Sequence, residues 1–276
     1  MSLQNSLHQT SPFGKIALLV LLMFLGILIS IVTLMAINAA FFHFPLDIID
    51  HLSATSSVAS INAAKSVQIA TQIGIFILPA LAFGYLASSS IWKGLSFTRN
   101  LSFGTLGLVV IITLLAIPFI NLLAQWNTLW HLPESWSSIE NWMRQTQLAN
   151  DQMISVLAQM NSPSAIIINI LMMAILPAIG EELIFRGVLQ TQLIKIFKNA
   201  HIGILVTALI FSAIHLQFLG FLSRAILGVL FGYLFYYSKN IWLPILAHFI
   251  NNFLALSLVF VYGIEMAETS FENTTD

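Results

Sequence analysis

Residues 16–40 read IALLVLLMFLGILISIVTLMAINAA, a run without a charged side chain. As an α-helix rising about 1.5 Å per residue, this run is longer than the roughly 30 Å hydrocarbon core of a bilayer. The apolar core of a secretory signal has only about 7–15 residues, so the run is too long to be one. It therefore predicts a membrane-spanning helix.

The composition of the whole chain agrees with a membrane protein. Of its 276 residues, 58% are hydrophobic and 8% are charged, whereas a soluble domain has roughly 25% charged residues. The net charge of -1 gives no indication of a nucleic-acid partner. With no cysteine in the sequence, disulfides, thiol catalysis and Cys-ligated metal sites are excluded.

Apolar runs of spanning length occur about seven times, and in lipid each must be helical because an open sheet edge would leave backbone groups unpaired. We therefore expect an all-α fold, a polytopic membrane helix bundle with about seven transmembrane helices. The expected spans are residues 16–40, 67–87, 105–123, 165–190, 202–216, 218–237 and 241–262. The fifth and sixth spans are separated by so few residues that a re-entrant hairpin is an alternative.

Positive charges flank one side of the expected bundle, as they do in cytoplasmic loops. This pattern places the N-terminus in the cytoplasm and the C-terminus outside, in a multi-pass protein of a bacterial cytoplasmic membrane. The flanking cations are Lys15, Lys93, Arg99, Lys195, Lys198 and Lys239, and the acids expected outside are Asp47, Asp50, Glu134, Glu140, Asp151, Glu265, Glu268 and Glu272.

Three regions follow from this organisation. Residues 1–160 would hold the N-terminal transmembrane helices and an outer amphipathic segment, residues 161–264 a catalytic transmembrane core, and residues 265–276 an acidic tail. In the outer segment, Trp142, Met153 and Leu157 recur at near-helical spacing, which favours a helix lying on the membrane surface. A lid that gates substrate access is the alternative.

Ionisable side chains within membrane spans are energetically costly and indicate a functional site. Here they gather in the fourth, fifth and seventh spans. Glu182 and Arg186 are four residues apart, a spacing that favours an ion pair and leaves Glu181 as the free carboxylate. Pro177 cannot donate to the preceding helical turn, so we expect a kink beside this acidic pair.

These residue types permit hydrolytic chemistry. A carboxylate in an apolar cavity can act as a general base, so we expect Glu181 to activate water. His248 and Asn252 are four residues apart and could together stabilise an oxyanion, while His215 could orient the water. The same Glu181, His215 and His248 could instead hold zinc as a His₂Glu set.

The motifs Glu181-Glu182-x-x-x-Arg186, Phe211-x-x-x-His215 and His248-x-x-x-Asn252, in this order, resemble the three signatures of the CAAX protease and bacteriocin-processing family, also called Abi. The family includes the type 2 prenyl-protein endoprotease, and the resemblance covers about residues 165–262. It implies an intramembrane glutamic endopeptidase without a cofactor, zinc being the alternative. The catalytic positions would be Glu181, His215, His248 and Asn252, and the supporting positions Glu182, Arg186 and Phe211.

The expected partners are the lipid bilayer and a peptide or protein substrate, which the resemblance implies to be lipid-modified or secreted. A transporter with a proton relay, or a non-catalytic immunity or scaffold protein, are alternatives from other classes. Gly228 and Gly232 form a G-x-x-x-G pattern typical of close helix packing. We expect Arg224 to extend its charge toward the membrane surface, with binding of a substrate carboxylate as the alternative.

Overall fold

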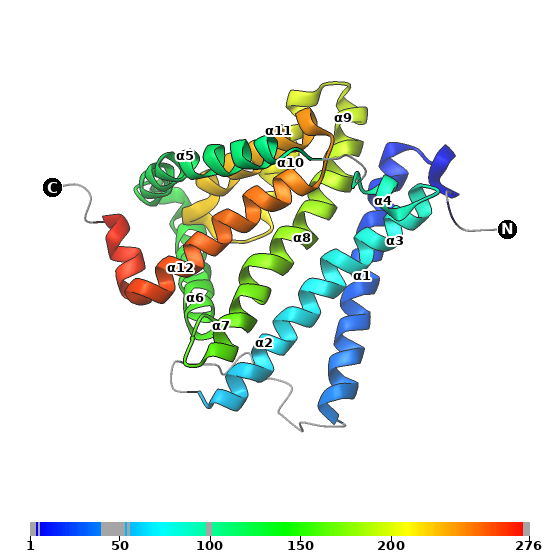
Figure 1. Cartoon of the computed structure of the whole chain (residues 1–276). Helices are drawn as coiled ribbons and strands as arrows, with labels where there is room; N and C mark the ends of the chain where they lie inside the picture. Colours follow the sequence, from blue (N-terminus) through cyan, green and yellow to red (C-terminus); the bar gives the residue numbers. More distant parts are fainter. Residues whose placement is uncertain (1–3, 5, 40–52, 54–55, 98–100, 273–276) are drawn as a thin grey trace.

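The computed structural model describes residues 4, 6–39, 53, 56–97 and 101–272, and their side chains as far as residue 261. Within these residues the chain is helical and contains no strand, so the all-α expectation is confirmed. Figure 1 shows long helices packed side by side, with short helices between them. The helices are η1 (Ser6–Gln9), α1 (Pro12–Ile37), α2 (Val58–Gln72), η3 (Ile73–Ile77), α3 (Leu78–Ala87), α4 (Ile91–Gly94), α5 (Phe103–Thr128), η4 (Glu134–Trp136), α6 (Ser137–Leu157), α7 (Pro163–Asn169), η5 (Ile170–Ile175), α8 (Leu176–Glu182), η6 (Leu183–Gln190), α9 (Thr191–Phe197), α10 (Ala200–Ala213), η7 (Phe218–Gly220), α11 (Phe221–Ser238) and α12 (Trp242–Glu272).

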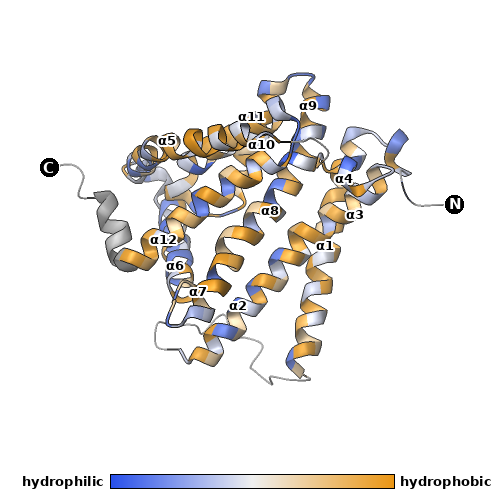
Figure 2. Cartoon of the chain, in the orientation of Figure 1, coloured by the Kyte–Doolittle hydropathy of each residue, from blue (hydrophilic) through white to orange (hydrophobic). Residues whose placement is uncertain are grey.

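Six helical stretches in the described part of the chain are long and apolar enough to cross a membrane, which supports an integral multi-pass protein. They are Pro12–Ile37, Val58–Ala87, Phe103–Thr128, Pro163–Phe197, Phe218–Ser238 and Trp242–Val261. Hydrophobic residues cover most of α1 and α5, and hydrophilic residues gather near helix ends (Figure 2).

The fifth expected span is shorter than the other helices that could cross a membrane. Its helix, α10, has 14 residues and rises only about 21 Å, less than the hydrocarbon core. The backbone of Leu216 takes a left-handed conformation with φ 52°, which a helix cannot continue through. The described part of the chain thus has six stretches of spanning length where about seven were expected, and α10 pairs with α11 as a short antiparallel hairpin.

Side-chain caps fix where several of these helices begin. Ser11, Ser57, Ser102 and Ser162 each accept a hydrogen bond from a backbone N–H in the first turn of α1, α2, α5 and α7. Asn199 does the same for α10 by accepting from the amide of Ile202 at 3.2 Å. Each cap satisfies one of the donors that a helix start leaves unpaired.

Proline residues coincide with local widening of two spanning helices. The π-helical turn η3 precedes Pro79, and the π-helical segment η5 precedes Pro177. Since proline has no N–H to donate, a wider turn accommodates the backbone without ending the helix. The distortion expected near Pro177 thus takes the form of a π-helical segment.

The C-terminal helices pack around the fourth span, Pro163–Phe197. The hairpin of α10 and α11 contacts η6, and α12 contacts α5, α8, η5 and α11. Because α10 and α11 are antiparallel neighbours, they either both cross the membrane or both return, and α12 starts on the same side in either case. Asp47, Asp50 and Arg99, used in the charge pattern, lie outside the described residues, as do 273–276 of the expected acidic tail.

Candidate active site within the membrane helices

The centre of the candidate site is the acidic pair on α8. Glu181 and Glu182 follow Pro177 by one turn and lie between the π-helical segments η5 and η6. Glu181 is 5% exposed and Glu182 is completely buried. The two carboxylates point in different directions, as expected for consecutive helical residues, and they have different partners.

Glu182 belongs to a buried ion pair. Its Oε1 accepts a hydrogen bond from Arg186 Nη1 at 2.9 Å, the pairing expected from the four-residue spacing. Arg186 also donates to the carbonyl oxygen of Gly228 at 3.0 Å, which ties α11 to the fourth span. The rings of Phe211 and Phe231 lie 4.6 and 5.4 Å from the guanidinium carbon, close enough for cation–π attraction.

His248 connects the two carboxylates. Its Nδ1 lies 2.9 Å from Glu182 Oε1, and its Nε2 lies 3.9 Å from Glu181 Oε2. Because Glu182 pairs with Arg186 as a carboxylate, it accepts the hydrogen bond and His248 Nδ1 donates it. Phe231 stacks on the imidazole with ring centres 5.1 Å apart, and this contact limits rotation of the His248 ring.

His215 approaches Glu181 from the loop after α10. Its Nδ1 lies 2.8 Å from the carbonyl oxygen of Phe211, and its Nε2 lies 3.9 Å from Glu181 Oε2. A carbonyl can only accept, so Nδ1 carries the proton and Nε2 of the neutral ring is left as an acceptor. Phe211 thus contributes its backbone to the orientation of His215 and its ring to Arg186.

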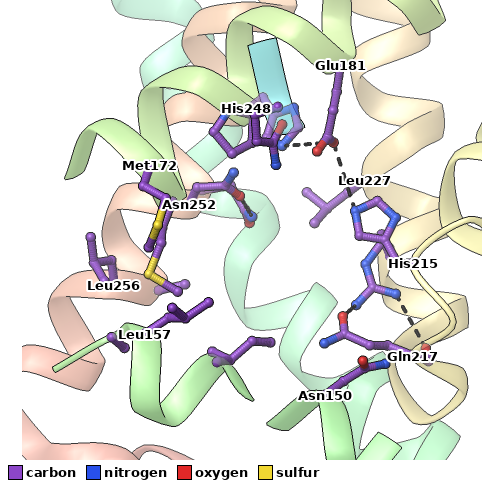
Figure 3. A pocket seen from close by; sticks show the side chains of 18 of the residues that line it. Asn150, Leu157, Met172, Glu181, His215, Gln217, Leu227, His248, Asn252 and Leu256 are labelled. Atoms are coloured by element: carbon purple, nitrogen blue, oxygen red, sulfur yellow. Dashed lines mark hydrogen bonds and ion pairs between the residues drawn. The ribbon is translucent and has the colours of Figure 1, made fainter. Parts of the chain in front are cut away.

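Asn252 lies one turn after His248 on α12 and lines the same cavity. Its Oδ1 accepts a hydrogen bond from Asn251 Nδ2 at 3.2 Å, and its Nδ2 donates to no other side chain or carbonyl among the described residues. Figure 3 shows Glu181, His215, His248 and Asn252 around one space. The structure therefore brings together all four side chains that the sequence singled out as catalytic candidates.

That space is a cavity of about 620 Å³, within the range of about 300–1,000 Å³ typical of ligand pockets. Its wall includes Gln68 and Gln72 of α2, Met172 of η5 and Leu227 of α11. Helix α6 closes another side through Asn150, Met153, Ile154, Leu157 and Ala158. The outer amphipathic segment is therefore part of the cavity wall.

The fit of a metal ion can be judged from the same distances. In a tetrahedral zinc site, with bonds of about 2.0–2.2 Å, ligand atoms lie about 3.4 Å apart. Both imidazole Nε2 atoms are 3.9 Å from Glu181 Oε2. Across the described part of the chain, no group of three or more His, Asp or Glu side chains could hold a metal ion. As they lie, both imidazole nitrogens are farther from the Glu181 carboxylate oxygen than two ligands of one zinc ion would be.

Sequence reasoning missed several contributors to this site. Phe231, Asn251 and Gln217 carry no charge and were not singled out, although they contact His248, Asn252 and Arg224. The G-x-x-x-G pattern did draw attention to α11, where a Cβ at Gly228 would lie 3.0 Å from the Cβ of Ala208. Asn169, the last residue of α7, donates to the carbonyl of Gln159 at 3.3 Å.

Comparison with known proteins shows which family the C-terminal part of the chain resembles. Residues 163–254, which include the fourth span, α10, α11 and the first part of α12, match the family model "Type II CAAX prenyl endopeptidase Rce1-like". This region resembles the CAAX protease family. The resemblance expected from the three motifs is thereby confirmed, and we refer to residues 163–254 as the Rce1-like region.

A curated relative adds a partial match. The chain is 35% identical over 86 residues to "Uncharacterized protein YpbD" of Bacillus subtilis (strain 168). This alignment covers 30% of the present chain and 41% of the relative, so the chain spans about two fifths of that protein's length. No solved structure matches the chain significantly.

Proposed function

We propose that this chain is an intramembrane endopeptidase in which Glu181 activates a water molecule to hydrolyse a peptide bond. One observation carries the proposal. Glu181 Oε2 lies 3.9 Å from Nε2 of both His215 and His248, on the wall of a large cavity between membrane-spanning helices. The Rce1-like match of the same residues supports it.

Glu181 and His215 can hold the nucleophilic water together. Two acceptors 3.9 Å apart can share one water molecule at ordinary hydrogen-bond lengths of about 2.8 Å. Within the described residues Glu181 Oε2 has no hydrogen-bond partner, so it is free to accept. Such a water donates one proton toward Glu181 and the other toward His215 Nε2, which leaves a lone pair on its oxygen for attack.

The oxyanion would be held on the opposite wall, by α12. Asn252 Nδ2 is a free donor, and His248 Nε2 becomes one when the ring carries both protons. Glu182 supports that form because a carboxylate beside Nδ1 stabilises a positively charged imidazole, as the acidic member of a catalytic triad does. Two donors aimed at the developing charge are a large source of rate acceleration.

The proposed hydrolysis then takes place in two steps. Water oxygen bonds to the carbonyl carbon while Glu181 takes its proton, and the carbonyl π electrons move to the oxygen held by Asn252 and His248. When the tetrahedral intermediate collapses, the C–N bond breaks and the proton on Glu181 passes to the leaving nitrogen. The carboxylate of Glu181 is thereby restored, without a covalent enzyme intermediate.

The apolar part of the cavity wall supports a proposal for the class of substrate. Leu157, Leu227 and Leu256 line the space beside the polar groups, so an apolar peptide segment, lipid-modified or from a secreted peptide, would fit it. We place residues 161–264 as the catalytic core. The charge pattern supports a cytoplasmic N-terminus and an external C-terminus in a bacterial cytoplasmic membrane.

The direct test is peptide hydrolysis by purified protein in proteoliposomes. Glu181→Gln keeps the volume of the side chain but removes the base, so we expect cleavage to fall by about 10²–10⁴-fold. The matched control is Glu134→Gln, an equally conservative change at an exposed position of η4 outside the cavity wall, which should leave the rate unchanged. Wild-type rates in Glu181→Gln would remove the proposal.

A second measurement addresses the zinc alternative. We expect chelator treatment to leave activity intact and elemental analysis of the active protein to find no stoichiometric metal. If zinc is present at one ion per chain and its removal abolishes cleavage, a metal-bound water replaces the Glu181 mechanism.

A further inference from the structure

Arg224 is a charged residue of the cavity that the proposed reaction does not use. It lies in the first turn of α11, is partly buried and lines the same cavity as Glu181. Among the described residues that line this cavity, it is the one Lys or Arg side chain. A guanidinium at membrane depth is costly unless its charge is compensated, so its presence requires an explanation.

The partners of Arg224 are neutral. Nη1 donates to the carbonyl oxygen of Gln217 at 3.4 Å, and Nη2 donates to the side-chain Oε1 of the same residue. Its electrostatic interactions include Glu181 and Asp151, but no carboxylate of the described residues forms an ion pair with it within 4.0 Å. Gln217 accepts hydrogen bonds from some of the five N–H donors of the guanidinium, but it is neutral and does not compensate the positive charge.

Arg186 shows what a structural arginine looks like in this protein. It is fully buried, has a carboxylate partner in Glu182, and is surrounded by aromatic rings. Arg224 has no such carboxylate and lies on the cavity wall, where a ligand can reach it. The difference indicates that the counter-charge of Arg224 arrives with the ligand.

We propose that Arg224 binds a carboxylate of the substrate and so fixes which peptide bond reaches Glu181. The inference rests on the proposed function, since it takes the cavity to be the peptide site. Guanidinium groups bind carboxylates through paired, charge-assisted hydrogen bonds, and partial burial of the site strengthens the attraction between the charges. The carboxylate comes from the chain end of the peptide or from an aspartate or glutamate side chain.

Binding of three fluorescent probes separates these sources. The probes are dansyl-tetraleucine with a free carboxylate, the same peptide as its C-terminal amide, and an amide in which one leucine is replaced by aspartate. Affinities are measured with the full chain in the Glu181→Gln background, so that no probe is consumed. Arg224→Gln and Arg224→Lys are added to this background, with Lys195→Gln as a control that removes an exposed cation elsewhere.

We expect a carboxylate probe to bind about tenfold or more tightly than the plain amide, a preference that Arg224→Gln reduces to about one and Lys195→Gln leaves unchanged. Arg224→Lys should keep part of the preference, because it retains the charge but not the paired geometry. A preference for the free-acid probe identifies the chain end, and one for the aspartyl amide identifies a side chain.

Equal binding of all three probes, or a preference that survives Arg224→Gln, overturns the inference. Neither result bears on catalysis, because binding is measured without turnover. Conversely, hydrolysis of a peptide by Glu181→Gln at the wild-type rate would contradict the proposed function. The measured affinities would still test whether Arg224 binds a carboxylate.

Discussion

Glu182 has two partners within the bundle, the guanidinium of Arg186 and the imidazole of His248, both at 2.9 Å. Glu182 and Arg186 are fully buried, and Arg186 Nε has no hydrogen-bond acceptor among the described residues. Glu182→Leu would leave the arginine charge buried and uncompensated. We expect this variant to lose about 3–5 kcal/mol of stability, measured as unfolding in detergent.

The double variant Glu182→Leu with Arg186→Met is the matched control for that measurement. Removing both charges together should restore most of the lost stability, because the buried site becomes apolar. Activity should stay low, since His248 has lost the carboxylate that orients it. If the double variant is as unstable as the single one, the ion pair is not what stabilises this region.

Asn252 provides a test of the oxyanion role at the level of one residue. Asn252→Ala removes a single donor at a partly buried position. We expect kcat to fall by about 10²–10³-fold, the usual cost of losing one oxyanion donor, with little change in KM or melting temperature. A change confined to KM would instead make Asn252 a substrate-binding residue.

Among the helices, α10 and α11 depend on close approach through glycine. A Cβ at Gly228 would lie 3.0 Å from the Cβ of Ala208 and 3.1 Å from its Cα. Gly228→Leu should therefore destabilise the protein by about 1–3 kcal/mol and disturb the carbonyl that Arg186 binds. Gly107→Ala on α5 is the control, because nothing lies within 4 Å of its added Cβ. Equal melting temperatures for the two variants would contradict this packing.

The connection between α5 and α6 carries a pH-dependent contact. The hydrogen bond from the Leu132 amide, and then those from His131 and Arg144, lower the pKa of Glu140 from 4.5 to about 2. A carboxyl group with a lowered pKa stabilises the folded state above pH 4.5, and this contribution is lost as the pH falls toward 2. We expect the carboxyl ¹³C shift of Glu140 to titrate near pH 2 and Arg144→Gln to move the midpoint upward. A midpoint near 4.5 in the wild type would contradict the contact.

The sequence predicted those features that depend on residues close together along the chain. Hydropathy located the spanning helices, and four-residue spacing predicted the Glu182–Arg186 pair. The bond from His248 to Glu182 joins residues 66 positions apart and depends on how α12 packs against α8, so no local pattern contains it. The position of α6 beside the cavity likewise depends on packing partners, which the amphipathic pattern of a single helix does not fix.

At the scale of the whole molecule, the membrane orientation can be tested because the native chain has no cysteine. We expect an impermeant maleimide to label Ser138→Cys on α6 in right-side-out vesicles. Lys195→Cys, also exposed, should react only after the vesicles are opened. The reverse pattern would place the N-terminus outside and contradict the reading of the flanking charges.

The most direct test of the mechanism is an experimental structure with a phosphinic peptide, whose two oxygens imitate those of the tetrahedral intermediate. We expect one oxygen within about 2.6–3.2 Å of Glu181 and His215, and the other within the same distance of His248 Nε2 and Asn252 Nδ2. A metal ion bridging the inhibitor to the histidines, or an inhibitor bound away from Glu181, would contradict activation of water by this carboxylate.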